Sequence, residues 1–164
     1  MNRTIQPRGL KLFTLVVARL LMGWYFLYEG VVKLFNPNWT SFGFLKSAQG
    51  LLQNVFQNMA EHPVLLSIID FLNIWGLILV GLSLMLGLLS RLSSIGGMVL
   101  VLLYYFAHPP IIAAQQLAVD IDHAVWVDRN LIFVALLAIL YAFPTSHIFG
   151  LDRLLNNKKE TINE

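Results

Sequence analysis

The chain has 164 residues, of which 57% are hydrophobic and only 12% are charged. Soluble domains are nearer half apolar and a quarter charged, so this composition predicts an integral membrane protein with one domain, residues 1–164. The absence of cysteine excludes disulfides, thiolate nucleophiles and cysteine-ligated metal centres. The net charge of +2 says little about partners, and we expect membrane lipid rather than nucleic acid around the chain.

Four apolar segments are candidates to cross a membrane. They cover about residues 12–32, 64–89, 92–107 and 124–143. Crossing the hydrocarbon core takes roughly 20 helical residues, so the third segment is short. The pattern predicts an all-α, four-helix membrane bundle.

A further helix is predicted between the first two spans. From Phe44 to Met59, apolar residues recur at helical spacing and amides fill the other face. This amphipathic segment either caps the bundle or serves as a connector at the membrane surface.

The distribution of Lys and Arg predicts the orientation of the chain. If four spans are threaded, most of these residues fall on one side of the membrane: Arg3, Arg8, Lys11, Arg91, Arg153, Lys158 and Lys159. The positive-inside rule then places both termini in the cytoplasm, as expected for a multi-pass protein of the cytoplasmic (inner) membrane.

Small residues follow one face of each of the first two spans. Gly23 and Gly30 lie on such a stripe in the first span, and Gly76 and Gly87 lie on one in the second. Small residues let membrane helices approach closely, so these stripes predict tight packing between spans.

Several ionisable residues lie in or beside the spans, all at the end of the bundle predicted to face outward: Glu29, Lys33, Asp70, Asp128 and Arg129. Such residues are usually paired, hydrated or functional. Glu29 and Lys33 have the spacing of a helical ion pair, and Arg129 has Asp70, Glu29 or Asp128 as potential partners. The cluster is therefore either an ion-paired lock on the packing or a polar pocket for a head group or protons.

The histidines do not indicate a metal or haem site. His62, His108 and His123 fall on the same predicted outer side, but no pair has ligand spacing. We expect neither metal nor haem. A single protonatable His108 beside a quinone carbonyl is one interpretation, and an interfacial histidine before a helix stop is the other.

These segments resemble the DoxX family. The similarity is carried by RLLMGWYFLYEGVVKLFNP at residues 19–37, by FLNIWGLILVGLSLMLGLLSRLSSIGG, by LYYFAHPP and by the closing GLDRLL. It is nearest to the DoxD-like branch, the small subunit of thiosulfate:quinone oxidoreductase. The resemblance implies a four-helix membrane subunit that works with quinone and with a second redox subunit, and it supplies no settled set of catalytic residues.

Two classes of function follow. The first is a quinone-linked oxidoreductase subunit, with a sulfur compound such as thiosulfate as the candidate reductant. Glu29, Asp70 and His108 would then supply protons, while Lys33, Asn73 and Arg129 would bind the head group. The isoprenoid tail would lie along the glycine-lined faces of the first two spans. The second class is a non-catalytic scaffold or partner-binding protein. The sequence leaves open whether the chain is itself an enzyme, and whether it pairs with a second redox subunit or forms a homo-oligomer.

Overall fold

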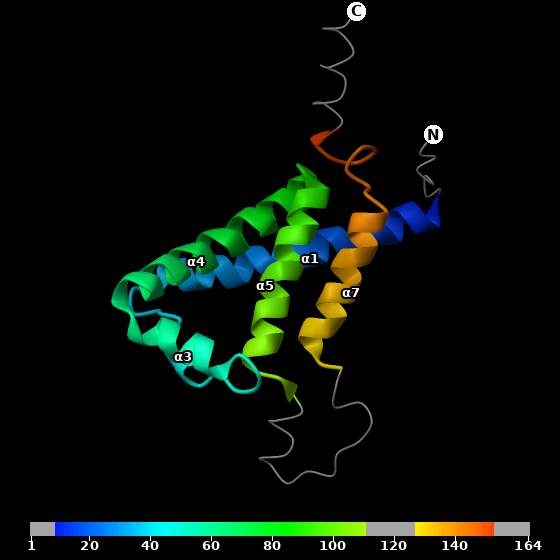
Figure 1. Ribbon diagram of the computed structural model, residues 1–164. Coiled ribbons are helices and arrows are strands. Elements are labelled where there is room, and N and C mark those ends of the chain that lie inside the picture. Colours follow the sequence, from blue (N-terminus) through cyan, green and yellow to red (C-terminus); the bar gives the residue numbers. More distant parts are fainter. Residues whose placement is uncertain (1–8, 111–126, 153–164) are drawn as a thin grey trace, which may run out of the picture.

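A computed structural model describes residues 9–110 and 127–152, and every regular element within these ranges is a helix. The arrangement is shown in Figure 1. The described helices are α1 (Leu10–Phe35), α2 (Phe42–Lys46), α3 (Gln53–Glu61), α4 (Pro63–Leu86), α5 (Ser90–Ala107) and α7 (Arg129–Ala142). The predicted all-α membrane class is confirmed.

Three of these helices, α1, α4 and α5, are long and apolar enough to cross a membrane. The fourth predicted span gives α7, an apolar helix of 14 residues. It begins later than predicted because Asp128 is its N-cap: the backbone there is extended, and the carboxylate accepts a hydrogen bond from the Leu131 N–H at 2.9 Å. The first residues of the predicted span, 124–126, lie outside the described ranges.

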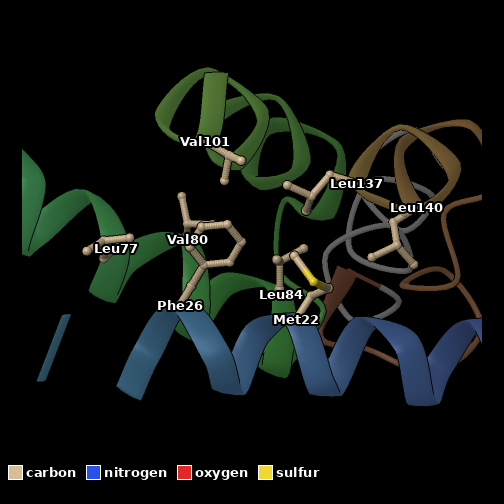
Figure 2. Close-up of a cluster of buried hydrophobic side chains, with 8 residues drawn as sticks. All are labelled: Met22, Phe26, Leu77, Val80, Leu84, Val101, Leu137 and Leu140. Carbon is tan, nitrogen blue, oxygen red and sulfur yellow. The ribbon is translucent and has the colours of Figure 1, made fainter. Parts of the chain in front are cut away.

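The four long helices share one apolar core. Figure 2 shows side chains from α1, α4, α5 and α7 pointing into a common interior. The buried cluster consists of Met22, Phe26, Leu77, Val80, Leu84, Val101, Leu137 and Leu140. Many other large apolar side chains are exposed on the outside of the bundle, among them Phe13, Leu79 and Val99. An exposed apolar surface of this kind fits contact with lipid.

The pairing of α1 with α4 depends on small residues. A Cβ on Gly81 of α4 would overlap the backbone N of Leu27 on α1 and lie 2.7 Å from its Cα. A Cβ on Gly23 or Gly30 would lie 2.9 Å from a backbone N of α4. The predicted close approach is therefore present, but it leaves no space between the glycine-bearing faces of α1 and α4. A quinone tail cannot lie along them, and that part of the prediction is wrong.

The predicted outer helix is divided in two. The chain leaves α2 at Lys46 and re-forms a helix only at Gln53, and between them Gly50 adopts a φ of 90°, a left-handed conformation that glycine tolerates. Continuous helical periodicity concealed this break. Leu45, Ala48, Phe56 and Ala60 are nevertheless buried together with Ala107, the last residue of α5.

At the opposite end of the bundle, the segment after α7 is bound to the turn between α4 and α5. Asp152 accepts a hydrogen bond from the Leu89 N–H at 2.8 Å. The buried Arg19 of α1 donates to the Thr145 hydroxyl at 3.0 Å and to the Phe149 carbonyl at 2.6 Å. Arg19 therefore joins α1 to this segment. Figure 1 shows the first turn of α1 and this segment at the same end of the molecule.

Candidate functional site

A polar cavity of about 380 Å³ lies at the end of the bundle where α1 and α5 end and α7 begins. We call it the polar cavity. Five of the six predicted site residues line it: Glu29, Lys33, Asn73, His108 and Arg129. They come from four different helices or helix ends. The rest of the lining is Tyr25, Phe26, Trp39, Thr40, Ser41, Phe44, Leu77, Val101, Tyr104, Asn130 and Phe133.

Lys33 is bonded to a neighbouring helix and not to its own. Its Nζ donates a hydrogen bond of 2.9 Å to Asn73 Oδ1 on α4. It also lies 5.0 Å from the centre of the Trp39 ring and 5.5 Å from that of Tyr104, within the range of cation–π attraction. The amide and the two rings contact the ammonium group directly, whereas Glu29 forms no ion pair with it and acts only through its charge.

The Asn73 side-chain amide that accepts from Lys33 also bonds Tyr104. Asn73 Nδ2 donates to the Tyr104 hydroxyl oxygen at 2.6 Å. Lysine has no acceptor, so the Asn73 oxygen must face Lys33 and its nitrogen must face Tyr104. The tyrosine oxygen therefore accepts from Asn73 and keeps its own proton. The Tyr104 hydroxyl is therefore available as a hydrogen-bond donor, and Tyr104 lines the cavity.

His108 carries a hydrogen-bond acceptor, whereas Tyr104 carries a donor. It follows α5 directly, and its Nε2 lies 3.1 Å from Ser47 Oγ. The Ser47 hydroxyl has two backbone carbonyls within reach, that of Gly43 at 2.8 Å and that of Phe44 at 3.2 Å. When its proton is donated to either carbonyl, the Ser47 oxygen accepts from Nε2–H of the matching tautomer. In this tautomer Nδ1 carries a free lone pair, and Nδ1 is buried without a hydrogen-bond partner.

The surroundings of His108 favour its neutral form. Burial lowers the pKa of the imidazole, and a hydrogen bond with the Ser47 backbone offsets part of that effect. The ring also packs on Phe44, with the ring centres 4.5 Å apart. A neutral imidazole with a free Nδ1 can accept a hydrogen bond from a ligand hydroxyl.

Glu29 and Arg129 line the cavity without forming the predicted ion-paired lock. Within residues 9–110 and 127–152, the only ion pair is between Lys46 and Glu61, at 2.5 Å on the surface. Arg129 is exposed at the first position of α7, and Glu29 is half-buried on α1. Among the described residues Arg129 forms no ion pair with Asp70, Glu29 or Asp128, so the predicted partnership is wrong.

Asp70 is the predicted site residue that does not line the cavity. Its Oδ2 accepts from the Thr40 hydroxyl at 2.8 Å. Its Oδ1 accepts from the Ser41 backbone N–H, also at 2.8 Å, and from the Ser41 hydroxyl. Thr40 and Ser41 form part of the cavity wall just before α2. Asp70 thus holds the cavity rim from behind, at a position where it does not meet a ligand in the cavity.

The other ionisable candidates lie elsewhere. Asp128 caps α7 and accepts from the Asn130 side chain at 2.7 Å. Neither Asp128 nor His62 lines the cavity. His123 lies outside the described ranges, as do Arg3, Arg8, Arg153, Lys158 and Lys159. No group of three or more potential metal ligands occurs among the described residues.

Sequence reasoning missed Tyr104, Ser47 and Trp39 as members of the site. Tyr104 lies one helical turn before His108, a spacing that places two polar side chains on one face of α5. That signal was present in the sequence. The contacts of Ser47 and Trp39 depend on the fold of the segment between α1 and α4, which no periodicity revealed.

Comparison with protein families identifies the chain's relatives. Comparison with curated proteins and with solved structures gave no match. The family model for DoxX matches residues 14–109, more than half of the chain. This range covers α1 from its second turn, α2 to α5, and all the residues of the polar cavity except those of α7. The chain therefore belongs to the DoxX family.

Proposed function

We propose that this chain is the quinone-binding subunit of a membrane oxidoreductase and that the quinone head group binds in the polar cavity. The observation that carries the proposal is the polar lining of this cavity, where the Lys33–Asn73–Tyr104 network and the His108 residue come together. The cavity volume of about 380 Å³ falls within the usual range for small-molecule sites. A few polar groups converging in such a cavity are the common pattern of a ligand site.

The cavity residues match what a quinone requires. When bound, a quinone accepts two electrons and two protons and becomes a quinol. The Tyr104 hydroxyl would donate a hydrogen bond to one carbonyl oxygen of the head group. Lys33 strengthens that donor because its positive charge polarises the Asn73 amide that bonds Tyr104. His108 Nδ1 is buried in this structure, so the imidazole ring would have to turn before it accepted a hydrogen bond from the product hydroxyl.

The two charged residues at the opening would serve the proton and charge balance. Glu29 is placed to hold a proton beside the cavity, and Arg129 is placed to favour negative charge on the head-group oxygens. We further propose that electrons come from a second subunit that oxidises a sulfur compound such as thiosulfate, as the DoxD-like resemblance implies. The cytoplasmic membrane, with both termini in the cytoplasm, is the proposed location.

The scaffold alternative makes a different demand on the same place. A scaffold whose charges only lock the bundle predicts a filled interior and paired charges at this end. The cavity favours the quinone proposal, and so does the lack of an ion pair involving Glu29 or Arg129 among the described residues.

Photo-crosslinking tests the proposal. An azidoquinone carrying the azide on its head group is added to membranes that contain the wild-type protein. We expect labelling in the peptides that contain Tyr104 and His108. Tyr104→Phe retains the ring beside Lys33 and removes only the hydroxyl, so it should weaken labelling roughly fivefold, about the value of one hydrogen bond. His108→Ala should weaken it similarly.

Two control variants are matched to the test. Tyr141→Phe removes a tyrosine hydroxyl from an exposed position near the other end of α7 and is the control for Tyr104→Phe. Arg91→Ala removes an arginine from the first turn of α5 and is the control for Arg129→Ala. Neither Tyr141→Phe nor Arg91→Ala should change labelling, whereas the cavity variants Tyr104→Phe and Arg129→Ala should weaken it. Labelling confined to the half of the protein around the α4–α5 turn, or equal in all variants, would refute the site and favour a scaffold.

A further inference from the structure

A second cavity adjoins the polar cavity and is almost entirely apolar. Its volume is about 260 Å³, and it lies beneath α2 and α3, against α4 and α5. We call it the apolar cavity. It is lined by Ser41, Phe44, Leu45, Phe56, Met59, Ile69, Leu72, Asn73, Leu100, Leu103 and Tyr104.

The two cavities share one wall. Ser41, Phe44, Asn73 and Tyr104 line both of them. Asn73 and Tyr104 are the residues that turn a polar edge toward the polar cavity. A ligand with a polar head and a hydrocarbon tail would therefore find its two environments side by side across this wall.

We propose that the apolar cavity holds the first part of the hydrocarbon tail of the quinone whose head group occupies the polar cavity. This inference rests on the proposed function. The tail needs an apolar path, and the glycine-lined faces of α1 and α4 do not provide one because their backbones are in contact. Of the two cavities, only this one offers a mainly hydrocarbon lining next to the head-group position.

Phe44 is the side chain that the tail would pass. It belongs to the five-residue helix α2, and 39% of its surface is exposed. Its ring packs edge-on against Tyr104, with the centres 5.6 Å apart, and also contacts His108. The bonds of Asp70 to Ser41 hold the residue that precedes α2 and so fix the backbone that carries Phe44. The α2–α3 segment then acts as the cover of the tail site.

Two photo-reactive probes locate head and tail separately. One is a benzoquinone with a ten-carbon tail and an azide on the head group. The other has the same head and tail with a diazirine at the tail's midpoint. We expect the azide to label the Tyr104–His108 region and the diazirine to label Met59 or Leu103. A diazirine label on the outer face of α1 or α4 would overturn the tail site while leaving the head site intact.

A matched pair of substitutions measures the contribution of the apolar cavity. Leu103→Trp fills it, whereas Val99→Trp adds the same side chain one turn earlier on α5, at a comparably exposed position outside the cavity. In lipid nanodiscs a displaced tail moves into other hydrocarbon and loses only packing contacts, so Leu103→Trp should weaken binding of the tailed quinone by about two- to fivefold. Val99→Trp should leave it unchanged.

The tail-less head group separates the two proposals. Leu103→Trp should not alter its binding if the apolar cavity holds only tail. Equal weakening of tailed and tail-less quinone would mean that the substitution disturbs the polar cavity, and would overturn the tail site. Loss of a bound phospholipid with unchanged quinone affinity would assign the cavity to a lipid chain, which also overturns it. Failure of the wild type to bind either quinone would instead reject the proposed function.

Discussion

Lys33 on α1 donates its hydrogen bond to Asn73 on α4, 2.9 Å away, and forms no ion pair with Glu29 one turn earlier on its own helix. This relationship joins two helices through a charge, and Glu29 lines the cavity without an ion pair to any described residue. The amide also bonds Tyr104, so the three side chains form one network across α1, α4 and α5.

The network should show measurable coupling. Lys33→Met and Asn73→Leu should each lower the free energy of unfolding, and the double variant should lose less than the sum, with a coupling of about 0.5–2 kcal/mol. The reason is that either single change already removes the same hydrogen bond. Denaturation of the detergent-solubilised protein gives the values. Lys33→Met combined with Glu29→Gln serves as control, and strong coupling there would show that Glu29 is the real partner of Lys33.

The glycines of α4 should differ sharply in their tolerance of a methyl group. Gly81→Ala places a Cβ into the Leu27 backbone and should destabilise the protein by roughly 1–3 kcal/mol or more. Gly76→Ala is the matched control on the same helix, because its nearest neighbours are flexible Leu100 atoms at 3.5 Å and beyond. Thermal unfolding distinguishes the two. Equal effects of both changes would argue against the tight pairing of α1 with α4.

Asp70 and Arg129 should act independently. Asp70→Ala removes the acceptor for Thr40 and Ser41 and should cost about 1–3 kcal/mol of stability. Arg129→Ala changes an exposed residue and should stay within about 0.5 kcal/mol. The double variant should be additive to within about 0.5 kcal/mol, whereas Asp70→Ala with Ser41→Ala should be clearly less than additive. Coupling between Asp70 and Arg129 would restore the ion pair that the sequence suggested.

Acidification should weaken the fold through His108. Burial lowers the pKa of His108 in the folded state below its ordinary value of 6.5. As the pH falls below about 6.5, the unfolded chain binds a proton that the folded chain binds only at lower pH, so stability decreases across that window. The loss should be smaller in His108→Gln. Unfolding midpoints measured between pH 7.5 and 5 test this, and an equal slope in both proteins would mean that other groups cause it.

The orientation of the bundle in the membrane can be tested by labelling introduced cysteines, because the chain has none of its own. Single cysteines at Asn58 on α3 and at Arg91 in the first turn of α5 both lie at exposed positions. If the excess of Lys and Arg sets the topology, a membrane-impermeant maleimide should label Asn58→Cys in intact cells and Arg91→Cys only after permeabilisation. The reverse pattern would place the polar cavity on the cytoplasmic side.

The sequence alone predicted the all-α membrane class, the approximate positions of the four long helices, and the gathering of polar residues at one end. These properties follow from composition and from apolar runs that span many residues, so they do not depend on contacts. It also predicted that six residues belong together because threading four spans brings them to one membrane level, and five of them line the polar cavity while Asp70 does not: Glu29, Lys33, Asn73, His108 and Arg129.

Only the tertiary structure decided which of these residues bond to one another. Lys33 pairs with Asn73 rather than Glu29, and Asp70 binds Ser41 rather than Arg129, because helix rotation and the path of the α1–α4 connection set the distances. The division of the outer helix at Gly50 and the apolar cavity beneath it likewise depend on one backbone conformation. Hydrophobic periodicity reports which face of a helix is apolar, but it carries no information on which side chain of a neighbouring helix that face meets.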